Sequence, residues 1–277
     1  MDIESIFNLT LLLAAFGGGL FAAALGPIGA FSLSGAMILV GIGTALTGNA
    51  DIVGLLAFGQ YTGPHIAFAS AVGALAYARR MGYTDNGMNV LLPLQSLKRW
   101  DVLVVGGLFG MLAQVLQSVF VGLGLTIDTI ALTVTILCLL ARIFFGKAGF
   151  LGSTPKEIKL ISDGNTFTYM LALGLGVGLV SSYATMVTGD PTIGFGFSAL
   201  SLILLWHGDF PVTHHIAICG AYAFVATGSL IVGGVFGLIA AIIGMIIGNI
   251  FNKNTDTFID PPGFTVAIMS FIIFTFM

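Results

Sequence analysis

Residues 26–40 read GPIGAFSLSGAMILV, and residues 190–204 read DPTIGFGFSALSLIL. At a constant offset of 164 residues, Pro27 aligns with Pro191 and Ser34 with Ser198. Three further pairs follow in the same order: HIAFASAVGA from His65 with HIAICGAYAF from His215, VGGLFG at 105–110 with VGGVFG at 232–237, and TIDTIALTVTIL from Thr126 with FIDPPGFTVAIM from Phe258. Four collinear matches indicate an internal duplication. Such repeats are typical of transporter folds, which bind their substrate where the two repeats meet.

The composition is that of an integral membrane protein. Hydrophobic residues make up 57% of the 277 residues and charged residues only 8%, with 39 glycines. A soluble domain carries about 25% charged residues and cannot bury this much apolar surface. No basic run interleaves with aromatic residues, so we expect no nucleic-acid partner. The two cysteines, Cys138 and Cys219, lie in apolar segments and are expected to be plain packing residues.

Ten apolar segments approach the length that a helix needs to cross a bilayer, about 20 residues. They predict an all-α membrane protein with about ten transmembrane helices. The predicted spans are residues 8–25, 29–47, 64–80, 102–124 and 127–145 in the first half, and 167–187, 191–206, 213–229, 231–251 and 261–277 in the second. Several spans are short and flanked by Gly or Pro, which is typical of broken helices in transporters.

The nine Lys and Arg residues predict the orientation in the membrane. They fall in or beside three segments, at Arg79 to Arg99, Arg142 to Lys159 (including Lys156) and Lys253. Basic loops stay in the cytoplasm, and with ten spans all three segments fall on that side. Both termini then lie outside, the first of them carrying Asp2 and Glu4 and no base. We therefore expect a multi-pass protein of the cell (inner) membrane.

Five spans in each copy force the second copy to enter from the opposite face. The sequence therefore predicts two inverted repeats, residues 1–145 and 167–277, joined by a cytoplasmic linker at 146–166. A second polar stretch, residues 81–100, occurs only in the first repeat, and its LLPLQSL core is expected to lie along the interface.

Prolines and aspartates mark the expected helix starts. Pro27 and Pro191 open the second span of each repeat, and Asp128, Asp190 and Asp260 are natural N-caps. Helix starts inside a membrane present free N–H groups that bind anionic or dipolar substrates. The alternative is that these residues only cap helices near the headgroups.

Other polar residues recur at matched positions. His65 and His215 begin the third and eighth spans, and the pairs Ser34/Ser198 and Thr133/Thr265 lie inside spans. Matched histidines suit proton relay or hydrogen bonding to a small solute, although each ring could simply lie in the headgroups. The candidate substrate-binding residues are therefore Pro27, Ser34, His65, Asp128, Asp190, Pro191, Ser198, His215 and Asp260.

Two features belong to one copy only. Gln114, Gln117 and Ser118 share one face of the fourth span, whereas their counterparts in the ninth are Ala, Gly and Met. The group His207, Asp209, His214 and His215 has ligand-like residue types, but its spacing matches no zinc pattern, so we expect no metal site. The Gly-Gly segments at 17–19, 106–107 and 233–234 predict close-packed helix faces.

The sequence contains no nucleophile–base pair, no catalytic carboxylate pair and no cofactor motif, so no enzyme is expected. Three functions stay open: a secondary transporter coupled to Na⁺ or H⁺, a passive channel for a small neutral or weakly charged solute, and a subunit of a larger ion-translocating complex. The expected partners are the lipid bilayer and a small-molecule or ion substrate, and a homo-oligomer is left open. In overall plan the chain resembles five-plus-five inverted families such as urea channels, ammonium channels and bile-acid-type sodium symporters. No site residue carries over from them.

Overall fold

The computed structural model describes residues 6–45, 51–153 and 158–277, so Asp2, Glu4 and Lys156 lie outside the described residues. Within these ranges the regular structure is entirely helical. The α-helices are α2 (Leu9–Leu25), α3 (Pro27–Ala45), α4 (Ala67–Arg80), α5 (Trp100–Gly122), α6 (Thr129–Phe145), α7 (Gly164–Thr188), α8 (Ile193–Ser201), α9 (His214–Thr227), α10 (Leu230–Phe251) and α11 (Pro261–Phe276). Shorter turns are η1 (Val53–Ala57), η2 (Leu94–Leu97) and η4 (Leu202–Trp206), which continues α8.

Each of the ten apolar segments holds one of these helices, and the helix ends lie within about three residues of the expected boundaries. The helical part of the prediction is therefore confirmed. By length and composition, α3, α5, α7 and α10 are able to cross a membrane. The apolar helices α2, α6, α8 with η4, α9 and α11 are shorter. This all-helical, apolar architecture is compatible with a helical membrane protein.

The caps explain why several helices begin where they do. The carboxylates of Asp128 and Asp260 accept hydrogen bonds from the third residue of α6 and α11, Ala131 and Gly263, at 2.9 and 2.7 Å. The expected caps are confirmed at both sites, and α3 begins at Pro27 as expected. Asp190 is different, because its carboxylate accepts from the amide and hydroxyl of Thr192 and forms a turn. The prediction of Asp190 as an N-cap was wrong, since α8 begins only at Ile193.

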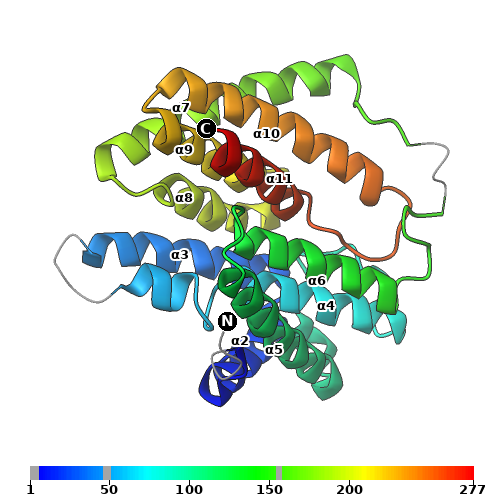
Figure 1. The fold of residues 1–277 in the computed structure, drawn as a ribbon. Helices are drawn as coiled ribbons and strands as arrows, with labels where there is room; N and C mark the ends of the chain where they lie inside the picture. The colour runs from blue at the N-terminus through cyan, green and yellow to red at the C-terminus, as the bar shows by residue number, and fades with distance from the viewer. Residues whose placement is uncertain (1–5, 46–50, 154–157) are drawn as a thin grey trace.

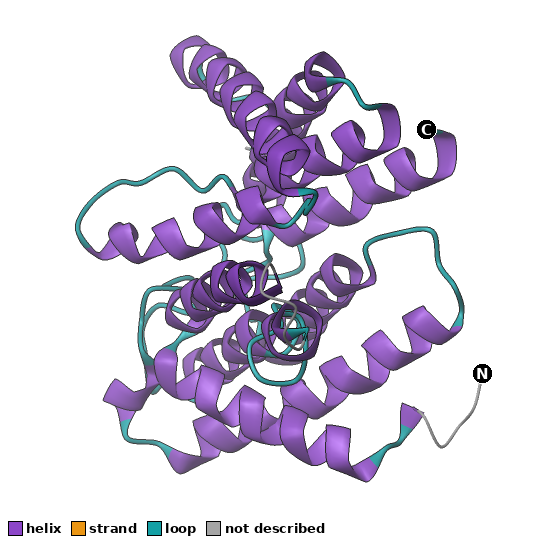
Figure 2. Cartoon of the chain, turned by 90° about the vertical axis from the view of Figure 1, so that its left-hand side faces the viewer, coloured by secondary structure: helices purple, strands orange, loops and turns teal. Residues whose placement is uncertain are grey.

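The helices form two groups, one from each half of the chain. Figure 1 shows α2 to α6 together in the lower part of the molecule and α7 to α11 in the upper part, and the turned view in Figure 2 keeps the two groups apart. Within the first half, α5 packs on α2 and α4; within the second, α10 packs on α7 and α9. Between the halves, α3 packs on α8 and α6 packs on α11.

Glycine controls the closest helix contacts in both halves. A Cβ on Gly19 of α2 would clash with the carbonyl oxygen of Gly106 in α5. In the second half a Cβ on Gly237 of α10 would lie 2.6 Å from Gly178 Cα in α7. Small residues let helix backbones approach in this way. The expectation of close-packed faces at the Gly-Gly segments is thus confirmed.

The segments that carry the basic residues meet at one end of the molecule. Arg142, near the end of α6, donates to the Thr257 hydroxyl at 2.8 Å and to the carbonyls of Phe150 and Phe251 at 2.9 and 2.7 Å. Ser153 donates its backbone N–H to the Asn254 carbonyl at 2.9 Å. The connections after α6 and after α10, which are distant in sequence, are therefore held together on the same side.

Candidate functional site

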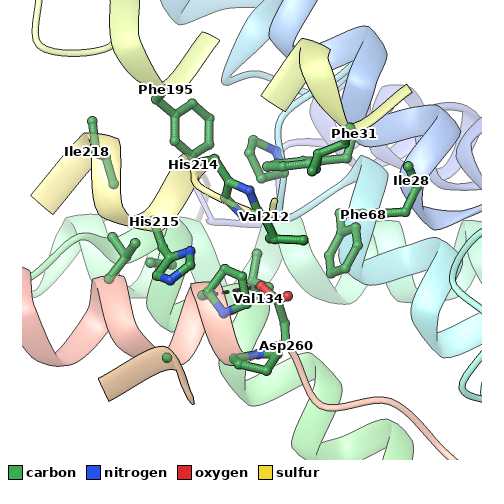
Figure 3. Close-up of a pocket in the computed structure, with 18 of the residues that line it drawn as sticks. Ile28, Phe31, Phe68, Val134, Phe195, Val212, His214, His215, Ile218 and Asp260 are labelled. Atoms are coloured by element: carbon green, nitrogen blue, oxygen red, sulfur yellow. Dashed lines mark hydrogen bonds between the residues drawn. The ribbon is translucent and has the colours of Figure 1, made fainter. Parts of the chain in front are cut away.

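A cavity of about 890 Å³ lies between the two halves of the chain. The first half contributes side chains from α3 and α6, and the second contributes side chains from α7 to α11. Figure 3 shows Phe31 and Phe68 on one side, His214 and His215 on the other, and Asp260 below them. Small-molecule sites in proteins usually occupy about 300–1,000 Å³, so the cavity has the size of an organic ligand site.

Aromatic rings form much of the cavity wall. Phe31 of α3 packs edge-on against Phe68 of α4 and Phe195 of α8, with ring centroids 5.5 and 5.7 Å apart. Phe195 also lies 6.1 Å from Phe58, the residue that follows η1. Phe31 and Phe195 are the matched aromatic positions of the two repeated segments quoted above. The interface of the halves is thus a cluster of rings with open space beside it.

Two histidines of α9 reach this space without hydrogen-bonding partners. The His214 ring lies 4.7 Å from the Phe31 ring and 5.7 Å from the His215 ring. Both nitrogens of His215 and Nδ1 of His214 are buried and lack a partner among the described residues. His215 is only 4% exposed, and no side chain among the described residues forms a hydrogen bond with it. An unsatisfied buried group is costly, which favours a ligand in the cavity.

The starts of α6 and α11 form the polar floor of the cavity. Both oxygens of the Asp128 carboxylate accept a hydrogen bond, Oδ2 from the Tyr222 hydroxyl at 2.8 Å and Oδ1 from Ala131 N–H at 2.9 Å. The Asp260 carboxylate accepts only through Oδ2, from Gly263 N–H. Its Oδ1 receives no hydrogen bond within the described structure, and the cavity lining includes no lysine or arginine.

The N-terminal end of α6 contacts α11, and the N-terminal end of α11 contacts α6. The Asp128 N–H donates to Ser270 Oγ in α11 at 2.8 Å. The thiol of Cys138 in α6 lies close to the backbone of Asp260. Ser270 and Cys138 are matched positions in the duplication, so the contacts are reciprocal. Both cysteines are free and buried, which confirms their expected role as packing residues.

The cavity opens at the end where the basic segments meet. Its lining includes Tyr169 and Val212, which are 56% and 38% exposed, and the exposed Asp209 of the loop after η4. The neighbouring Trp206 donates its indole N–H to the Leu91 carbonyl, in the polar stretch between α4 and α5. The loop after η4 therefore forms part of the exposed rim of the cavity.

A second, smaller cavity of about 370 Å³ lies on the other side of Phe58. Gln60, His65, Gln114, Gln117 and Ser118 line it. Gln60 donates to Gln114 Oε1 at 2.9 Å, and Gln114 donates to Ser118 Oγ at 3.0 Å. Among the lining residues of the two cavities, Phe58 alone is shared.

The sequence-predicted site residues separate into three groups. Asp128, His215 and Asp260 line the large cavity, and His65 lines the small one. The remaining predicted residues, Pro27, Ser34, Asp190, Pro191 and Ser198, line neither cavity. Buried Ser34 instead donates to the backbone carbonyls of Ala30 and Thr62.

Sequence reasoning missed the aromatic wall and the position of Phe58. Single phenylalanines in a chain with 23 of them carry no distinguishing signal. Gln60 was missed too, because it lies in a connection without a helical pattern. The matched pair Phe31/Phe195 was the available clue, since both residues lie in the repeated segment.

The sequence profile of a family of unknown function, DUF7973, matches the chain over residues 1–163 and again over residues 161–277. The two ranges meet just before α7 and together cover the chain. No curated protein and no solved structure matches the chain.

Proposed function

We propose that this chain, which belongs to the DUF7973 family of unknown function, is a membrane transport protein built from two inverted five-helix repeats. Its substrate site is the large cavity between the repeats, and its mechanism is secondary transport by alternating access. The observation that carries the proposal is the pair of separate cavities, one open toward the basic segments and one beyond Phe58.

The pattern of helix contacts supports two repeats related by a pseudo-two-fold axis. Pairing the helices in order matches α2 to α6 with α7 to α11. Each major contact inside the first half then has its counterpart in the second, for example α2 on α5 with α7 on α10. The contacts between halves join each helix to its own counterpart, α3 to α8 and α6 to α11. A two-fold relation between the halves accounts for this arrangement, and the double family match supports the duplication.

The overlap of α6 and α11 supports helix starts within the membrane. Asp128 meets Ser270, the tenth residue of α11, and Asp260 meets Cys138, the tenth residue of α6. At 1.5 Å per residue, the antiparallel pair overlaps over about 15 Å and spans about 35 Å in total. A hydrocarbon core is about 30 Å thick, so both starts lie well inside it. Short helices that begin at mid-depth are typical of transporter sites.

The meeting of the basic segments supports the orientation. Arg142 joins the connections after α6 and after α10, and Trp206 joins the loop after η4 to the connection after α4. These are four of the five connections that ten spans assign to the cytoplasm, and three of the four carry the basic residues. We therefore assign the large cavity's opening to the cytoplasm, and both termini and the small cavity to the outside of a cell membrane.

In this arrangement Phe58 is the gate. Its ring separates a cytoplasm-facing cavity from an outward polar cavity and packs against Phe195 of the opposite repeat. Movement of the repeats about the α3–α8 contact would displace Phe195 from Phe58 and open the other path. A passive channel would instead need both cavities joined at the same time.

Cysteine labelling in sealed vesicles tests the proposal without knowledge of the substrate. The background is Cys138→Ser with Cys219→Ser, and the reporters are Val266→Cys in the large cavity and Ser118→Cys in the small one. A membrane-impermeant maleimide is expected to label Val266→Cys from the cytoplasmic side only and Ser118→Cys from the outside only. Adding Phe58→Ala should make Val266→Cys reactive from both sides.

Two outcomes decide against the proposal. If both reporters react from the same side, the two cavities do not belong to opposite access paths. If Val266→Cys reacts from both sides while Phe58 is intact, the protein is a channel and not an alternating-access transporter. The exposed Gly124→Cys and Ser153→Cys, beyond opposite ends of the helices, serve as orientation controls for the vesicles.

A further inference from the structure

The carboxylates that line the large cavity have no basic side chain beside them to balance their charge. Three carboxylates line the cavity, those of Asp128, Asp209 and Asp260, and its lining residues include no lysine or arginine. The positive ends of α6 and α11 point toward the same space, but each is already offset by its own capping carboxylate. An anionic ligand would therefore find no charged partner, whereas a cation would find one.

Among the three carboxylates, Asp260 is the one placed to hold that cation. Asp128 already accepts from Tyr222 and Ala131, and Asp209 is exposed at the opening. Asp260 is 6% exposed, and its Oδ1 accepts no hydrogen bond from the described residues. The unpartnered nitrogens of His215 add a neutral acceptor or donor in the same cavity.

The walls match an organic cation and not a bare metal ion. A hard metal ion needs about six oxygen ligands, and no group of three potential metal-ligating side chains occurs within the described residues. The faces and edges of Phe31, Phe68 and Phe195 surround the space above Asp260. Aromatic rings attract alkylammonium groups through their negative faces and also bury apolar bodies. A cavity of about 890 Å³ leaves room for a body of one or two rings.

We propose that the large cavity binds an organic monocation with an aromatic or similarly sized apolar body, and that Asp260 is the counter-ion for its charged group. This inference rests on the proposed function for its biological meaning, since the cation would be the transported substrate. The binding step itself does not require transport and is tested separately.

The test uses three probes of similar shape and different charge on the purified full-length protein in detergent. They are phenyltrimethylammonium, its neutral isostere tert-butylbenzene, and benzenesulfonate. Titration calorimetry is expected to give the cation an affinity at least about ten times that of the neutral probe, because only the cation gains the carboxylate. Benzenesulfonate is expected to bind more weakly than either.

Asp260→Asn identifies the counter-ion. Asparagine is also a good N-cap, so α11 should remain intact, and the thermal unfolding midpoint checks this. The variant should lose at least about ten-fold in affinity for the cation and keep its affinity for the neutral probe. The matched control is Asp163→Asn, because Asp163 caps α7 on the exposed surface and should leave all three affinities unchanged.

Preferential binding of benzenesulfonate, or a cation affinity that Asp260→Asn does not change, overturns the inference. Failure here with the expected labelling pattern intact would leave a transporter for another substrate class. Cation binding that depends on Asp260, combined with failed sidedness in labelling, would instead retain this site and refute alternating access.

Discussion

The surroundings of the two matched histidines differ more than their backbone positions do. In the first half, His65 faces a small cavity filled at its edge by the amides of Gln114 and Gln117. In the second half, the matched positions are Ala241 and Gly244, and His215 faces the large cavity. The same helix framework is thus filled with polar side chains in one half and left open in the other. A few side chains on α5 and α10 therefore decide which of the two histidines faces the open cavity between the halves.

The substitution with the largest expected effect is Gly244→Gln, which places in α10 the glutamine that α5 has at the matched position, Gln117. A Cβ at Gly244 would lie 2.7 Å from His215 Nε2, so the longer side chain must push His215 and itself into the cavity. We expect phenyltrimethylammonium binding to fall by at least about 1,000-fold, which corresponds to about 4 kcal/mol. Titration calorimetry measures the loss.

The matched control is Gly43→Gln, because a Cβ on Gly43 meets no other atom within 4 Å. It should bind the probe as the unmodified protein does. If Gly244→Gln kept its affinity, the ligand would not occupy the space beside His215. The difference between Gln117 in α5 and Gly244 in α10 would then have no role in binding.

Replacing each histidine by alanine tests the same contrast with a smaller change. His215→Ala removes a buried group whose two nitrogens face the cavity unpaired, and should weaken cation binding by about 30-fold, or about 2 kcal/mol. His65→Ala should leave binding unchanged, since His65 lines only the cavity beyond Phe58. Equal losses in both variants would argue that one continuous site includes both histidines.

Gln114→Ala probes what the amides contribute to the first half. Gln114 is 5% exposed and links Gln60 to Ser118, so its loss leaves the Gln60 amide without its partner. We expect the free energy of unfolding to fall by about 1–2 kcal/mol, while cation binding stays constant. Equilibrium unfolding in detergent measures the change. The counterpart Ala241→Gly, which removes no hydrogen bond, serves as the comparison in the second half.

The sequence predicted the framework well and the site only in part. Hydropathy located the ten helices, and the matched aspartates located the starts of α6 and α11, because both signals are local in sequence. Asp190 failed as a cap because the turn through Pro191 and Thr192 delays α8. A side-chain hydrogen bond two residues away competes with a cap, and local composition does not distinguish the two.

The cavity itself could not be predicted from local patterns, because open space arises only when distant side chains fail to fill it. Nothing in the sequence around Phe58 indicates that its ring separates two cavities. The pairing of Gln117 with Gly244 was visible as a difference between the copies. The consequence of this difference follows only from the structure, in which a Cβ at Gly244 of α10 would lie 2.7 Å from Nε2 of His215 in α9.

The smallest test concerns the reciprocal contacts of α6 and α11. Asp128 N–H donates to the Ser270 hydroxyl, whereas the matched Asp260 backbone meets the weaker thiol of Cys138. Cys138→Ser would make the two contacts alike, and we expect it to stabilise the protein by up to about 0.5–1 kcal/mol, because a hydroxyl accepts more strongly than sulfur. The reverse change, Ser270→Cys, should destabilise it by a similar amount. Thermal unfolding of both variants decides the point: shifts of the same sign would show that the two contacts are not equivalent and that the two-fold relation ends before these residues.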